Sequence, residues 1–157
     1  MIKTFIRLTM VSVFTLGIIS CAEDPNDTLS VGDGVTPVTA ADCTTLIIGS
    51  VKEWEVAVNQ TTVPTGNTTF LISNRGTIPH EFLVVKTNFA DGKIPIDPAT
   101  NRFSEEGDGL EVVDEISEWK NGTTESLTLS LEAGKYQLLC NIEAHYANGM
   151  HIAFTVR

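Results

Sequence analysis

From residue 44 to the C-terminus, short apolar stretches alternate with polar breaks. The clearest case is residues 125–131, where Leu127, Leu129 and Leu131 stand at every second position and polar residues lie between them. This period of two is typical of β-strands with one buried face. We expect strands at 44–50, 53–58, 68–74, 80–87, 110–116, 125–131, 135–140 and 150–156. No stretch has a convincing helical period, so the pattern predicts an all-β protein, an antiparallel sandwich of seven to eight strands.

The expected strand at 80–87 begins with a histidine and continues with apolar residues. His80, Phe82 and Val84 should share one face, and Leu83 and Val85 the other. In the expected strand 53–58, Trp54 is predicted to lie in the core. Residues 88–109 form the longest irregular stretch, for which we expect a solvated acidic excursion and no function.

The first twenty residues have the organisation of an export signal. Lys3 and Arg7 precede an apolar run at 8–19, which is too short to span a membrane as a helix. The sequence Ile18-Ile19-Ser20-Cys21 is similar to the lipobox at which bacterial lipoproteins are cleaved and lipidated. We therefore expect a lipoprotein signal peptide at 1–20 and lipidation of Cys21. The alternative is an ordinary secretory peptide with a coincidental cysteine at this position.

Residues 21–43 are rich in Gly, Pro, Asp and Thr and contain few large apolar side chains. Such a segment buries too little surface to offset the cost of ordering, so it is expected to be a flexible tether. Cys43, at its end, is expected to be a free thiol. Residues 44–157 would then form one domain, exported and lipid-anchored to the cell membrane or outer membrane, facing the periplasm or the exterior.

The chain is acidic, with a net charge of −10. Removal of residues 1–20 would leave 8 basic and 20 acidic side chains, and 8 minus 20 is −12. This charge excludes nucleic acid as a partner, and it leaves the lipid as the expected contact with the membrane. It could steer the protein to a basic patch on a redox partner, or it could simply keep an exported protein soluble.

The candidate chemistry lies near the C-terminus, where Cys140, His145 and Met150 follow the spacing C-x4-H-x4-M between two expected strands. A thiolate, an imidazole and a weak thioether suit one copper ion that cycles between Cu(I) and Cu(II). A blue-copper site has a second histidine. The chain contains three histidines, and His151 adjoins Met150, so the missing ligand should be His80.

On these residues the chain resembles the cupredoxins, in particular the rusticyanin, auracyanin and sulfocyanin-like group, over roughly residues 45–157. The resemblance implies a Greek-key sandwich, a type 1 copper site formed by His80, Cys140, His145 and Met150, and a monomeric electron carrier. It also implies an apolar docking patch around His145. Here that patch would consist of Ile78, Pro79, Tyr146, Ala147 and Gly149.

Three residues near the expected ligands should modify the site. Glu81 and Glu143 bring carboxylates close to the metal, which should lower its reduction potential. Asn141 should brace the loop through hydrogen bonds to the backbone.

Three functions are conceivable for such a site. The first is a one-electron carrier between exported redox partners. A relative of the copper enzymes is disfavoured, because those families place a histidine beside the copper cysteine, whereas Cys140 lies between Leu139 and Asn141. The remaining alternative is a copper-binding or delivery protein whose metal is cargo.

Overall fold

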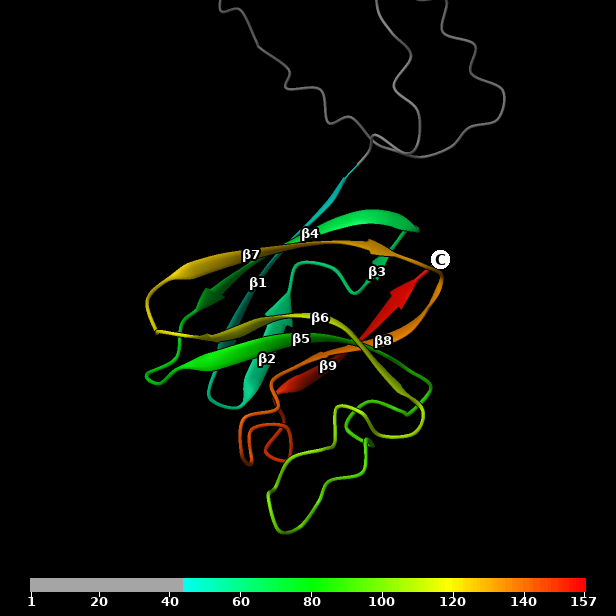
Figure 1. Cartoon of the computed structure of the whole chain (residues 1–157). Coiled ribbons are helices and arrows are strands. Elements are labelled where there is room, and N and C mark those ends of the chain that lie inside the picture. The colour runs from blue at the N-terminus through cyan, green and yellow to red at the C-terminus, as the bar shows by residue number, and fades with distance from the viewer. Residues whose placement is uncertain (1–43) are drawn as a thin grey trace, which may run out of the picture. The chain divides into compact units, whose positions relative to one another are not determined.

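The computed structural model describes residues 44–157, which fold as a β-sandwich (Figure 1). Its strands are β1 (Thr45–Lys52), β2 (Glu55–Val58), β3 (Thr62–Val63), β4 (Gly66–Asn74), β5 (His80–Thr87), β6 (Leu110–Trp119), β7 (Thr124–Leu131), β8 (Gly134–Leu139) and β9 (His151–Val156). The predictions of a signal peptide at 1–20, of lipidation at Cys21, of a tether at 21–43 and of a free thiol at Cys43 lie outside the described residues. Among residues 44–157 there is no helix long and apolar enough to span a membrane.

The strands form two sheets. One has the order β2-β1-β4-β7 and the other has the order β3-β9-β8-β5-β6. The prediction of an all-β sandwich is confirmed, with two differences. The described residues contain nine strands, because the two-residue β3 is too short to produce a sequence period. The sheets are mixed, since β1 pairs with β4 and β3 pairs with β9 in parallel. Parallel pairing joins strands through longer crossover connections, which a local pattern does not reveal.

The main core lies between the two sheets. Ile47, Phe70 and Ile72 contribute from the first sheet, and Phe82 and Phe154 contribute from the second. All five are 0 or 1% exposed. The alternation of the sequence therefore describes the inward faces correctly, and hydrophobic burial between the layers fixes the sandwich.

Strand β5 is buried on both faces. Phe82 and Val84 face the main core, as predicted, while Leu83 and Val85 belong to a second apolar cluster on the other side. That cluster is completed by Ile94 and Phe103 from the loop between β5 and β6, and by Tyr146. The prediction that residues 88–109 are a solvated excursion is wrong for Ile94 and Phe103. Both are 3% exposed, because the loop folds back over the outer face of the second sheet.

Trp54 does not lie in the core. Lys52 and Glu55 are partners in the β1–β2 ladder, so Glu53 and Trp54 form the two-residue turn between the strands. The Trp54 side chain is 48% exposed and its φ is 102°, a left-handed conformation that is unusual for a bulky residue. The prediction of a buried Trp54 failed because the pairing register, and not the residue type, decides where a strand ends.

Candidate metal centre

His80 is positioned by the turn that precedes β5. The Asn74 side chain organises this turn: its Nδ2 donates to Ile78 O at 3.0 Å and to Trp119 O at 3.1 Å, and its Oδ1 accepts from Gly76 N at 3.0 Å. Asn74 is 1% exposed, so these bonds form away from water. The turn therefore delivers His80 to the main core in a defined position.

The loop between β8 and β9 supplies the other candidate ligands. Its ends are joined where Cys140 N donates to Met150 O at 3.0 Å, and Met150 N donates to His145 O at 3.1 Å. Ala144 has a φ of 65° and Gly149 a φ of 111°. These left-handed residues make the loop compact enough to bring His145 back over the ends of the strands.

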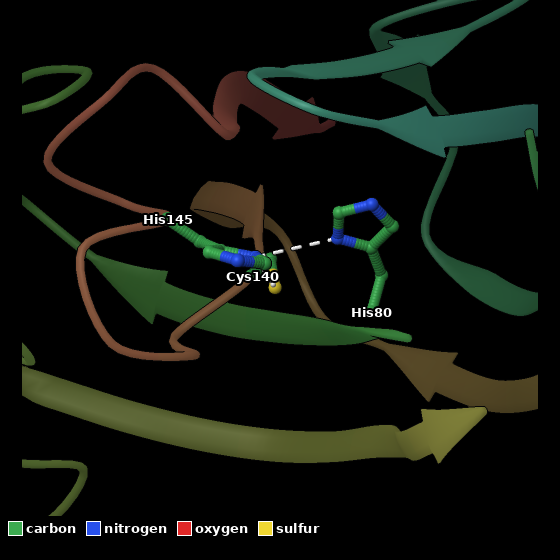
Figure 2. Close-up of side chains that lie close together, drawn as sticks. All are labelled: His80, Cys140 and His145. Atoms are coloured by element: carbon green, nitrogen blue, oxygen red, sulfur yellow. Dashed lines mark hydrogen bonds between the residues drawn. The ribbon is translucent and has the colours of Figure 1, made fainter. Parts of the chain in front are cut away.

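Three side chains from these two segments point toward one another (Figure 2). Nδ1 of His145 lies 3.3 Å from Nδ1 of His80 and also 3.3 Å from Sγ of Cys140. The candidate ligand atoms of the three residues all lie within 4.8 Å of one another. His80 and Cys140 are 0% exposed and His145 is 4% exposed.

Burial determines the protonation of this cluster. It lowers the pKa of both imidazoles below the usual value, because desolvation disfavours the imidazolium, and so favours neutral rings. It also raises the pKa of the Cys140 thiol to about 11. A metal that binds here would displace the thiol proton, as thiolate ligands require.

The Met150 backbone is hydrogen-bonded to Cys140 and to His145, and the residue is 0% exposed. Together with it, the His80, Cys140 and His145 cluster fits a single type 1 copper site, because two imidazoles, one thiolate and a weak thioether are the ligands of such sites. Nε2 of His80 is buried and has no hydrogen-bond partner among the residues that the structure describes.

The long loop 88–109 packs against the loop between β8 and β9, residues 140–150, which we call the metal loop. Asn141 Oδ1 accepts from Phe103 N at 3.1 Å, and Asn141 Nδ2 donates to Phe103 O at 3.1 Å and to Glu105 Oε1 at 3.0 Å. Ala144 N donates to Asn101 O at 3.0 Å. The bracing role predicted for Asn141 is confirmed. The contact of the loop 88–109 with the metal loop was not predicted, because its acidic composition is typical of a solvated segment.

Glu81, the residue after His80, is buried and contacts the backbone of Asn141. Its Oε1 accepts from Asn141 N at 2.6 Å, while burial raises the pKa of its carboxyl to about 7. Glu143, by contrast, is exposed to solvent. Of the two predicted carboxylates, only Glu81 lies in the protein interior.

The predicted docking patch requires one correction. Tyr146 is 2% exposed, because its hydroxyl donates to Gln137 Oε1 at 3.1 Å and accepts from Ile94 N at 3.0 Å. Ile78, Pro79 and Ala147 are exposed, as predicted, and Gly149 is half-buried. The larger exposed group is Trp54, whose ring meets the His145 ring edge to face with centroids 5.5 Å apart.

Glu53, beside Trp54, is the other functional candidate that the sequence analysis missed. Its Oε1 lies 3.9 Å from Nε2 of His80. Hydrogen bonds, first of all from the Thr77 backbone, lower the pKa of this carboxyl to about 2. No sequence signal marked either residue, because their proximity to the histidines depends on where the β1–β2 turn falls.

Comparisons with known proteins agree with this architecture. No family model matches the chain, and no curated protein matches it. Among solved structures, auracyanin B is 20% identical, with a TM-score of 0.52 over 80% of this chain and 96% of that one. Auracyanin A, a "blue" copper protein from the green thermophilic photosynthetic bacterium Chloroflexus aurantiacus, is also 20% identical. Its TM-score is 0.52 over 73% of this chain and 100% of that one.

At these identities the two auracyanins show the fold. The predicted resemblance to the cupredoxins is confirmed as a likeness in fold to the two auracyanins. The part of the chain that the structure describes therefore has the cupredoxin fold.

Proposed function

We propose that this protein is a type 1 copper protein that carries single electrons. The observation that supports it most directly is the convergence of two imidazoles and one thiol, all buried, with their ligand atoms within 4.8 Å of one another. Burying two imidazoles and one thiol in an apolar core is costly unless their polar atoms are bonded, and one metal ion would bond to all three side chains.

In this proposal each of the four side chains has its own role. His80 and His145 bind through Nδ1, the atoms that face each other, and Cys140 binds as a thiolate. Met150 contributes a weak thioether ligand that tunes the potential. Bound copper supplies the Cu(I)/Cu(II) couple. The chain excludes water and holds the donors in one arrangement, which limits rearrangement when the charge changes.

A carrier role is favoured over an enzymatic one by the surroundings of the site. Cys140 is flanked by Leu139 and Asn141, and Asn141 is occupied by bracing bonds to the long loop. No second cluster of three potential metal-ligating residues is found within residues 44–157. We propose that redox partner proteins meet the molecule at the exposed surface formed by Trp54, Ile78, Pro79 and Ala147.

We also propose that the protein is exported and lipid-anchored through Cys21, with residues 21–43 as a tether and 44–157 as the copper domain. The support is the sequence around Cys21. Metabolic labelling with an alkyne fatty acid should label the wild type and not Cys21→Ala. Equal labelling of both would contradict the anchor and leave the copper proposal intact.

The proposed function is tested by loading the protein with Cu(II). We expect an intense visible charge-transfer band, the EPR spectrum of a Cu(II)–thiolate site and reversible voltammetry, and we expect Cys140→Ser to lose the band. Copper that moves rapidly to a metal-free acceptor without redox cycling would instead support a delivery protein. A colourless, weakly bound Cu(II) would contradict both.

A further inference from the structure

The second nitrogen of the His80 imidazole faces a fixed carboxylate from a distant turn. Nε2 of His80 is fully buried and lacks a hydrogen-bond partner among the described residues, and Glu53 Oε1 lies 3.9 Å from it. The Glu53 side chain is 25% exposed, so its outer side meets water while its inner side meets the ring. The distance exceeds a hydrogen bond, and the interaction is one of charge with the ring dipole.

The carboxylate is held by the turn that also positions the histidine. Glu53 Oε1 accepts from Thr77 N at 2.7 Å, from Thr77 Oγ1 at 2.8 Å and from Ile78 N at 3.2 Å. Three donors on one oxygen favour an ionised, immobile acceptor. Its negative charge therefore stays at a constant place relative to His80.

Gly76 keeps the space between these groups open. A Cβ on this residue would lie 2.6 Å from His80 Nε2 and 2.8 Å from Glu53 Oε2. Any side chain here would push the ring and the carboxylate apart. The close approach of Glu53 to His80 is thus a property of the turn as well as of the two residues.

A neutral imidazole carries its hydrogen on one of two nitrogens. The Nδ1 atom of His80 faces Nδ1 of His145, where a free lone pair is needed if this residue is to bind a metal. A carboxylate beside Nε2 favours the hydrogen at that nitrogen, because the N–H dipole then points at negative charge. We propose that Glu53 is a positioning residue that selects the Nε2–H tautomer of His80 and so presents the Nδ1 lone pair to the metal centre.

This inference rests on the proposed function for its purpose, but its test can begin without metal. Glu53→Gln keeps an oxygen acceptor for Thr77 and Ile78 and removes the charge. In the metal-free protein labelled with ¹⁵N, NMR of the imidazole nitrogens should show His80 as the Nε2–H tautomer. The variant should show a mixture of tautomers, and after loading it should bind Cu(II) about tenfold more weakly.

Two further variants separate charge from structure. Glu55 lies in the same hairpin as Glu53, and its carboxylate pairs with Lys52 at 3.3 Å. Glu55→Gln removes this carboxylate and should leave the His80 tautomer unchanged. Thr77→Val removes one bond to Glu53 but keeps the carboxylate, so it should lower stability without changing the tautomer. If Glu53→Gln leaves the tautomer unchanged, or if Thr77→Val changes it equally, the positioning role is overturned. A wild-type protein without the blue band would contradict the proposed function, whatever the tautomer of His80.

Discussion

Nδ1 of His80 lies 3.3 Å from Nδ1 of His145, although the two residues are 65 positions apart in the sequence. One histidine begins β5 and the other belongs to the loop after β8, and strands β5 and β8 are neighbours in the same sheet. The metal centre thus lies where the turn before β5 and the loop after β8 come together. Its geometry depends on both connections, and several variants can test them separately.

Met150→Leu should retain the fold and the blue band but raise the reduction potential. Leu has a similar volume to Met, so the loss in unfolding free energy should stay below about 1.5 kcal/mol. Without the thioether the site loses a weak donor that stabilises the oxidised ion. Voltammetry and visible spectra of the two proteins give the comparison, and an unchanged potential would argue against Met150 as a metal ligand.

Gly76→Ala should damage the metal centre through steric conflict. The new Cβ would lie 2.6 Å from His80 Nε2, so the ring must move, and we expect a loss of about 1–3 kcal/mol in stability together with weaker Cu(II) binding. Gly122→Ala is the control. Gly122 has a φ of 78°, and a Cβ on it would meet no other atom within 4 Å, so its replacement should cost about 1 kcal/mol through the backbone alone. Equal Cu(II) affinities in both variants would contradict this account.

Asn141→Ala should loosen the contact between the long loop 88–109 and the metal loop. It removes three side-chain bonds and leaves Phe103 N buried without its acceptor, which should cost about 1–3 kcal/mol. Amide hydrogen exchange at 101–105 should accelerate. Asn148→Ala, which removes one exposed bond to Ala144 O within the same loop, should have a smaller effect. Slow exchange at 101–105 in Asn141→Ala would show that apolar packing alone holds the loop.

Trp54→Gly should uncover His145 without destabilising the turn. Glycine accepts the φ of 102° that strains tryptophan, so stability should be maintained or rise by about 1 kcal/mol. In the metal-free variant an imidazole-modifying reagent should react faster with His145, which is 4% exposed in the wild type. His151, measured in the same sample by mass spectrometry, serves as the internal control and should react at an unchanged rate. If the His145 rate also stays constant, other side chains cover the ring.

Glu81→Gln should raise the reduction potential more than Glu143→Gln does. Negative charge stabilises Cu(II), and the interior carboxylate of Glu81 is screened less than the exposed carboxylate of Glu143. Glutamine also keeps an acceptor for Asn141 N. Voltammetry at pH 8 and low salt should reveal the order, and a larger shift in Glu143→Gln would reverse our assignment of the two roles.

The spacing of residues accounts for the parts of the site that are local in sequence. Cys140, His145 and Met150 lie in one connection, so their proximity follows from a short loop between two strands. His80 could be named because the chain contains three histidines and one of them adjoins Met150. The structure then places His80 within reach of Cys140 and His145.

Tyr146 and Trp54 show the limit of residue type as a guide to burial. Both are aromatic and both were assigned to the wrong environment, Tyr146 to the surface and Trp54 to the core. The Tyr146 hydroxyl is buried because Gln137 and Ile94 N satisfy it. Trp54 is exposed because the β1–β2 register ends the ladder at Lys52 and Glu55. Neither the hydrogen-bond partners of Tyr146 nor the register of β1 with β2 can be inferred from residue type.

By itself the sequence determined an all-β chain, the inward faces of its strands and the kinds of atom available to a metal, because strand period and ligand chemistry are properties of nearby residues. Only the tertiary structure decided that two strand pairs are parallel, that the acidic loop 88–109 packs on the metal loop, and that Glu53 faces His80. Those relationships arise from register and burial between segments far apart in the chain. Their free energy comes from contacts that no local pattern encodes.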